Sequence, residues 1–199
     1  MRIGIPWNLQ GLTTLPLPKR EAFRNFLAAL HHSGATLVHD MHISGAAEFE
    51  SLSTASRQIM LDTDMKLAIN TYLSSLATNP QNIHTLRDLI AFTKACPAEE
   101  YPCRNVEVFE RAERTRPDDR LYRDMLSRDG YFAGEGGVPG ALDGYQCDVL
   151  LLPALSVTMQ TFAAKAGSPV LSLPMGVYPH DTPVEKDGNG LVDVAPGIP

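Results

Sequence analysis

The sequence has 199 residues, of which 44% are hydrophobic and 20% are charged. These fractions are typical of a folded globular protein, exclude a disordered chain, and leave no apolar stretch long enough to span a membrane. Seventeen basic and 23 acidic side chains give a net charge of -6, which argues against nucleic-acid binding. The length predicts a single domain over residues 1–199.

The first forty residues predict a strand, a helix and a second strand. The apolar run from Met1 to Trp7 has the length of a short strand. A helix is expected to begin near Lys19, with apolar residues at helical spacing, and Gly34 is well placed to end it. The segment Ala35–His39 then predicts the next strand. This order is typical of the βαβ unit of a layered α/β domain.

The middle of the chain predicts helices. Residues 51–76 carry one broad apolar stripe. Thr85, with Asp88 three residues later, resembles a capping box and opens a further helix. Shorter helices are expected over residues 106–114 and 119–128. The glycine-rich run at 134–144 lacks the Gly-Lys-Ser/Thr ending of a phosphate loop, so a flexible loop is expected there.

The last third predicts two buried strands and a hairpin. Each of the runs Asp148–Ala154 and Gly167–Gly176 is apolar, of strand length, and contains a proline that cannot donate to a sheet ladder. One crossover helix fits the link from Ser156 to Ala166. Further on, the turn Asp187–Gly190 between two strand-like segments predicts a hairpin.

Five stretches together resemble the C-terminal half of the amidase signature family, and they follow one another in the family's order. They are Arg2–Asn8, Tyr72–Leu76 with Leu86–Ile90, Asp148–Ala154, Gly167–Gly176 and Asp181–Pro183. The resemblance implies an α/β fold with αβα layers and a mixed β-sheet. It also implies that the intact protein hydrolyses small-molecule amides, giving a carboxylate and ammonia or an amine, without a cofactor.

Members of this family attack the amide with a serine, assisted by a second serine and a lysine in an upstream Gly/Ser-rich stretch. A nucleophilic hydroxyl needs a neighbouring base and an oxyanion site. This sequence has no Gly-Ser-Ser-Gly-Gly run, and its nearest serine pair, Ser74-Ser75, lies in a helical apolar pattern. We therefore predict no catalytic residue in this chain, and no amidase turnover by the chain alone.

The resemblance also implies where substrate would lie. In the family, the link between the two apolar strands faces the acyl side of the active site. This places Thr158, Met159, Ala166, Gly167 and Ser168 near the edge of a pocket. Of these, Thr158, Met159, Gly167 and Ser168 are the predicted substrate-binding residues. An alternative reading, in which the glycine only sets a turn, stays open.

Metal and cysteine chemistry are disfavoured. His31, His32, His39 and His42 cluster in the sequence, but none of them are spaced i and i+4, and histidines near a helix C-terminus are favourable through the helix dipole alone. Three cysteines are too few for a disulfide framework. A nucleophilic Cys147 would need a base such as a downstream histidine, which nothing in the sequence brings close. We expect no metal site.

Other functions remain open from the sequence. A non-catalytic binding or antigenic module is the main alternative, and a glutamine amidotransferase subunit is disfavoured because the insertion typical of that branch is missing. A sheet open along one side would favour self-association through its exposed edge. The N-terminus has no charged-then-apolar leader. Because the resemblance implies a start further upstream, this says little about the compartment of the parent protein, which stays unknown, with a cytoplasmic location favoured.

Overall fold

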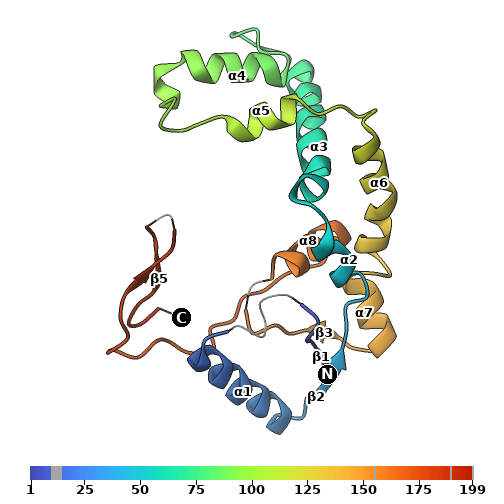
Figure 1. Cartoon of the computed structure of the whole chain (residues 1–199), viewed down its shortest axis with the longest axis vertical. Helices are drawn as coiled ribbons and strands as arrows, with labels where there is room; N and C mark the ends of the chain where they lie inside the picture. Colours follow the sequence, from blue (N-terminus) through green and yellow to red (C-terminus); the bar gives the residue numbers. More distant parts are fainter. Residues whose placement is uncertain (10–14, 155, 189, 199) are drawn as a thin grey trace. The chain divides into compact units, whose positions relative to one another are not determined.

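The computed structural model describes residues 1–9, 15–154, 156–188 and 190–198. The chain divides into two compact units, residues 1–50 with 131–199 and residues 51–130 (Figure 1). The single domain predicted from chain length stays a prediction.

The first unit is built on a three-stranded sheet in the order β2-β1-β3. Its strands are β1 (Arg2–Pro6), β2 (Thr36–Met41) and β3 (Val149–Leu150). Both strand pairs are parallel, whereas the resemblance implies a mixed sheet. Helix α1 (Leu17–His32) connects β1 to β2, as parallel neighbours require. The predicted βαβ start and the α/β class are confirmed.

The core of this sheet is apolar and lies under α1. Phe23 and Leu27 of the helix are buried together with Ile5 of β1. The partly buried Leu37, Leu151 and Met175 pack against them, so segments from both ends of the chain share one core. Gly34 takes φ +90° after the helix, a left-handed conformation that glycine adopts without a steric penalty, as the sequence predicts.

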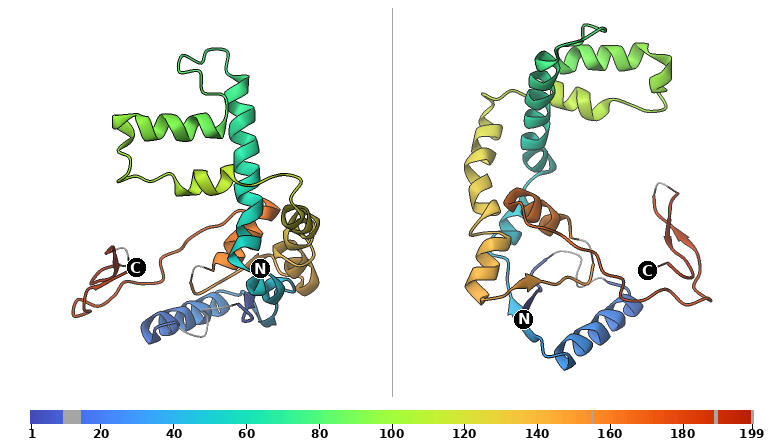
Figure 2. Two further views of the ribbon diagram at one scale, coloured as in Figure 1. Left: turned by 45° about the horizontal axis from the view of Figure 1, so that its top comes forward. Right: turned by 180° about the vertical axis from the view of Figure 1, so that it is seen from behind.

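The second apolar run is not a buried strand, so that prediction was wrong. Within the first run only β3 is a strand. In Gly167–Gly176 no residue belongs to a strand, and Leu171 is 88% exposed. Figures 1 and 2 show the chain leaving α8 (Val157–Ala166), the predicted crossover helix, as an extended ribbon. Strand propensity depends on packing against a neighbouring strand, and no described residue supplies that neighbour.

The glycine-rich run is partly helical, so the predicted flexible loop was wrong over α7 (Val138–Tyr145). Here glycine permits close packing. A Cβ on Gly137 would lie 2.1 Å from the carbonyl oxygen of Phe132, and one on Gly140 would lie 2.0 Å from that of Glu135. Glycine, which has no Cβ, is the residue that fits both positions.

The hairpin predicted near the end of the chain is confirmed. Strands β4 (Glu185–Lys186) and β5 (Val192–Val194) pair in antiparallel fashion. Gly190, in the connection between them, takes φ +80°. Asn189, part of the predicted turn, lies outside the described residues.

The second unit is helical, as expected for the middle of the chain. It comprises α3 (Thr54–Ser75), α4 (Leu86–Ala95), a 3-10 turn (Pro97–Glu99), α5 (Glu107–Glu113) and most of α6 (Arg120–Ala133), whereas α2 (Ala46–Ser51) ends at its boundary. The capping box is confirmed: Thr85 accepts from the backbone of Asp88, and the Asp88 carboxylate accepts from the backbone of Thr85. Hydrogen bonds from Thr85 and from the backbone of His84 lower the pKa of Asp88.

Polar contacts tie the helices of the second unit together. Asp62 of α3 is buried and accepts two hydrogen bonds from the Arg111 guanidinium of α5, at 2.6 and 2.9 Å. The hydroxyl of Tyr122 in α6 donates to Asp64 at 2.8 Å. This hydrogen bond, with burial, raises the pKa of Tyr122. Buried polar groups paired in this way fix how α5 and α6 pack on α3.

Candidate functional site

The predicted substrate-binding residues lie in helix α8 and directly after it, and local hydrogen bonds and backbone conformation set both ends of the helix. At its start, the Ser156 side chain accepts a hydrogen bond from the backbone of Met159 at 3.3 Å. At its end, Gly167 takes φ +65° and its N–H bonds back to the last turn. A serine N-cap and a left-handed glycine are the usual boundaries of a helix.

The first two predicted residues are buried. Thr158 is 6% exposed, and its hydroxyl donates to the Glu50 carboxylate at 2.9 Å. The side chain of Met159 is 5% exposed. Both therefore lie inside the protein, where they support the position of α8 within the first unit.

The other two predicted residues lie at the far end of the helix. Gly167 is exposed, and Ser168 is half-buried with its backbone N–H bonded to the carbonyl of Ala163 at 2.8 Å. Met159 and Gly167, the nearest residues of the two pairs, are eight positions apart along α8 and its C-cap, which is about 12 Å at 1.5 Å per residue. The structure thus does not bring the two pairs of predicted residues together.

Three phenylalanines hold α8 in place. Phe162 of α8 lies 5.1 Å from Phe49 of α2 in an edge-to-face arrangement, and 5.4 Å from Phe132 in a stacked arrangement, between ring centroids. Phe49 and Phe132 complete the triangle at 5.4 Å. The three residues are distant in the sequence and follow no periodic pattern, so sequence reasoning missed this cluster.

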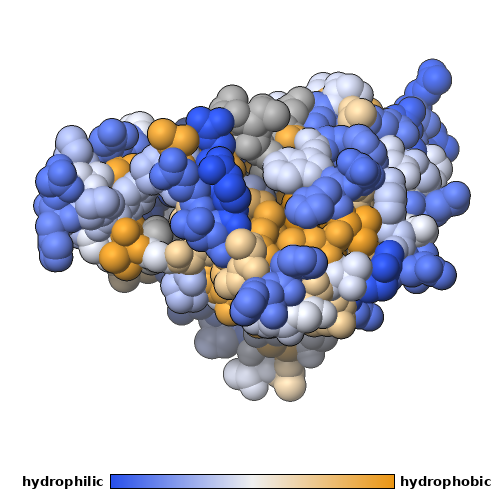
Figure 3. Space-filling view, turned by 90° about the horizontal axis from the view of Figure 1, so that it is seen from below, coloured by the Kyte–Doolittle hydropathy of each residue, from blue (hydrophilic) through white to orange (hydrophobic). Residues whose placement is uncertain are grey.

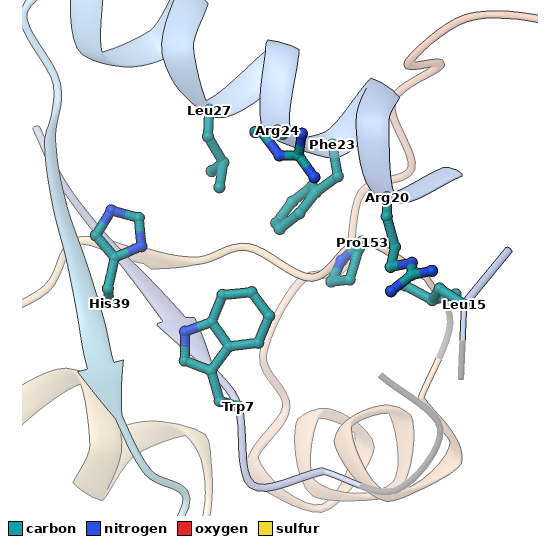
Figure 4. A pocket seen from close by; sticks show the side chains of 8 residues that line it. All are labelled: Trp7, Leu15, Arg20, Phe23, Arg24, Leu27, His39 and Pro153. Atoms are coloured by element: carbon teal, nitrogen blue, oxygen red, sulfur yellow. The ribbon is translucent and has the colours of Figure 1, made fainter. Parts of the chain in front are cut away.

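A cavity of about 280 Å³ lies in the first unit (Figure 4). Its lining combines apolar and cationic side chains from α1, β2 and the segments that follow β1 and β3. They are Trp7, Leu15, Arg20, Phe23, Arg24, Leu27, His39 and Pro153. Sequence analysis did not predict this site, because no motif marks it and its residues come from four separate segments.

The residues considered for nucleophilic or metal chemistry are not assembled into such a site. The Ser75 hydroxyl donates to the carbonyl oxygen of Tyr72 at 2.7 Å near the end of α3. The Cys147 thiol donates to the Tyr145 carbonyl at 3.6 Å. Within the described parts of the chain, no three His, Cys, Asp or Glu side chains are grouped to hold a metal ion. No helix there is long and apolar enough to cross a membrane.

Comparison with known proteins identifies relatives. The chain is 32% identical over its whole length to a protein of Arthroderma benhamiae named "Putative amidase", and spans 33% of that relative. Its fold matches the native peptide amidase of Stenotrophomonas maltophilia with a TM-score of 0.63, at 21% identity, over 83% of this chain and 34% of the other. A peptide amidase bound to the competitive inhibitor chymostatin matches equally well, over 35% of its length. No family model matches.

These findings define the class of protein. The fold is that of part of an amidase, and the sequence similarity extends over the whole chain. The resemblance to the amidase signature family is thereby confirmed, and the chain corresponds to the C-terminal portion of such a protein. It spans about a third of the length of the relatives it matches.

Proposed function

We propose that this chain forms the C-terminal portion of an amide hydrolase and supplies structural support for its active site. In the whole protein, water would add across a carboxamide, a C–O bond would replace the C–N bond, and the products would be a carboxylate and ammonia or an amine. The observation that carries this proposal is the whole-length similarity to an amidase-named relative, together with the shared peptide-amidase fold.

The chain alone is expected to have no amidase activity, because its sequence contains no Gly/Ser-rich nucleophile stretch. The test is to incubate the purified chain with benzamide and with a peptide amide, and to measure released ammonia. A serine-directed fluorophosphonate probe serves as a second measurement. Background ammonia release and no stoichiometric labelling are expected, whereas turnover at enzymatic rates or one label per chain would contradict the proposal.

We keep the α8 residues as the predicted substrate side, with different roles at the two ends. Gly167 and Ser168, at the accessible end, would contact the acyl group. Thr158 and Met159 are buried and would hold the helix in position without contacting the substrate. NMR titration of the chain with benzamide tests this division. Amide shifts at Gly167 and Ser168 are expected, and shifts confined to other segments would overturn it.

Self-association is the second part of the proposal. The exposed side chains of Val170, Leu171 and Leu173 form an extended apolar segment, and no described residue makes a hydrogen bond with Pro169–Val177. Figure 3 shows one face of the molecule on which hydrophobic residues reach the surface among hydrophilic ones. Unpaired extended backbone and exposed apolar side chains favour pairing with another chain. A second copy would satisfy both.

Sedimentation over a range of protein concentrations tests this association. Leu171→Lys is expected to shift the chain towards monomer, because it places a charge in the pairing segment. Val157→Lys is the matched control, since Val157 is equally apolar and 70% exposed but lies on a helix. A wild-type chain that stays monomeric at high concentration would contradict the proposal, as would equal effects of the two substitutions.

A further inference from the structure

The cavity beside α1 combines apolar side chains with positive charge that no carboxylate of the described residues neutralises. Trp7, Phe23, Leu27 and Pro153 supply its apolar surface, and Figure 4 shows the Trp7 indole and the Phe23 ring on opposite sides of it. Its volume of about 280 Å³ is close to the lower end of ordinary small-molecule sites, about 300 Å³. This size and lining suit a compact apolar group.

Arg20 and Arg24 give this cavity its charge. They are spaced i and i+4 on α1, and both are exposed. Neither guanidinium has an ion-pair or hydrogen-bond partner among the residues that the structure describes, whereas Arg87, Arg104 and Arg111 are all paired with carboxylates. Like charges at this spacing repel one another. An anion between them would remove that repulsion.

The third polar side chain of the lining is also compatible with an anion. His39 of β2 can donate a hydrogen bond from its ring, and no acidic residue is among the eight that line the cavity. A planar carboxylate matches the forked donors of arginine. The lining is therefore complementary in charge to a carboxylate and in polarity to a hydrocarbon tail.

We propose that this cavity binds small carboxylates that carry an aromatic or aliphatic tail. The carboxylate lies at Arg20 and Arg24, and the tail packs between Trp7 and Phe23. The site is distinct from the α8 residues and does not depend on amide hydrolysis by the whole protein. The cavity would bind a carboxylate even where the chain has no amidase turnover.

The only tryptophan of the sequence lies in this cavity, so its fluorescence reports on binding directly. The chain is titrated with 4-phenylbutyrate and, as a neutral isostere, with 4-phenylbutyramide. Exposed ion pairs contribute about 0.2–1 kcal/mol each, so two arginines predict about two- to thirty-fold tighter binding of the acid at low salt. Added salt should reduce this difference, because it screens exposed charges.

The variant Arg20→Gln/Arg24→Gln separates charge from apolar contact. It is expected to bind the acid as weakly as the amide, while Arg57→Gln, an exposed arginine of the second unit, leaves the preference unchanged. Circular dichroism checks that each variant is folded. Equal affinity of the wild type for acid and amide, no fluorescence response to either, or an unchanged preference in the double variant would each overturn the proposal.

Discussion

Replacing Phe162 by alanine tests whether the phenylalanine cluster holds α8 in the first unit. The ring is fully buried and contacts two further phenylalanine rings, Phe49 and Phe132. Phe162→Ala removes the ring and leaves a cavity between helices, since the backbone around it is fixed by close packing. The expected loss of unfolding free energy is about 3–5 kcal/mol, the usual cost of deleting a buried aromatic ring.

The substitution Phe162→Leu separates the part of this free-energy loss that comes from hydrophobic volume from the part that comes from aromatic ring contacts. Phe162→Leu keeps most of the hydrophobic volume but loses both aromatic pairs, each worth about 0.5–1.5 kcal/mol beyond burial. We therefore expect a loss of about 1–3 kcal/mol for this variant. Val157→Ala, on the same helix but exposed, should change stability by no more than about 0.5 kcal/mol.

Urea unfolding followed by far-UV circular dichroism measures all three variants under the same conditions. The loss of unfolding free energy should decrease in the order Phe162→Ala, Phe162→Leu, Val157→Ala. In thermal unfolding, Phe162→Ala should have a Tm about 6–20 °C below that of the wild type. If Phe162→Ala cost no more than Val157→Ala, the cluster would not be what fixes α8. The position of α8 would then depend on other contacts, such as the buried Thr158 and Met159.

Further substitutions test packing, capping and pH dependence. Gly137→Ala should destabilise the protein in thermal unfolding, because its Cβ would lie 2.1 Å from a backbone oxygen. At Gly144, in α7, a Cβ would meet nothing within 4 Å. Gly144→Ala should therefore stabilise the protein by about 0.5–1 kcal/mol in the same assay. Thr85→Ala removes the α4 cap and should cost about 1 kcal/mol in the same assay. Tyr122→Phe removes the hydrogen bond to Asp64 and should cost about 1 kcal/mol in urea unfolding near neutral pH. The native pKa of Tyr122 is raised. Its contribution to the free energy of unfolding is therefore complete below the unfolded tyrosine pKa of about 10 and is lost as pH rises through the native value. The stabilities of the wild type and Tyr122→Phe should converge at alkaline pH.

Local sequence signals predicted the local structure well. The capping pair Thr85 and Asp88, the glycine after α1 and the hairpin turn each specify a backbone conformation through residues that are close in sequence, and all were found where expected. The ion pair between Asp62 and Arg111 joins residues 49 positions apart, and no local pattern connects them. Such contacts depend on tertiary packing, which composition and periodicity do not record.

The sequence predicted neither the helix within the glycine-rich run nor the cavity at Trp7, and the two omissions have related reasons. Glycines suggest a loop when only backbone freedom is considered, but Gly137 and Gly140 are required by close approach of the chain to itself. The cavity at Trp7 could not be predicted from the sequence either, because four separate segments contribute its lining. The resemblance to amidases supplied the residues of α8, yet only the structure reveals that they lie at opposite ends of the helix.

The exposed segment Val170–Leu173 shows how pattern and environment can disagree within one chain. Its residues have the composition of a strand buried in a sheet, yet Leu171 is almost fully exposed and no described residue pairs with its backbone. An apolar strand of this kind is stable only when another strand or surface covers it. Whatever covers it must therefore supply both backbone hydrogen bonds and apolar contact, which is why a charge at Leu171 should disturb association and a charge on exposed α8 should not.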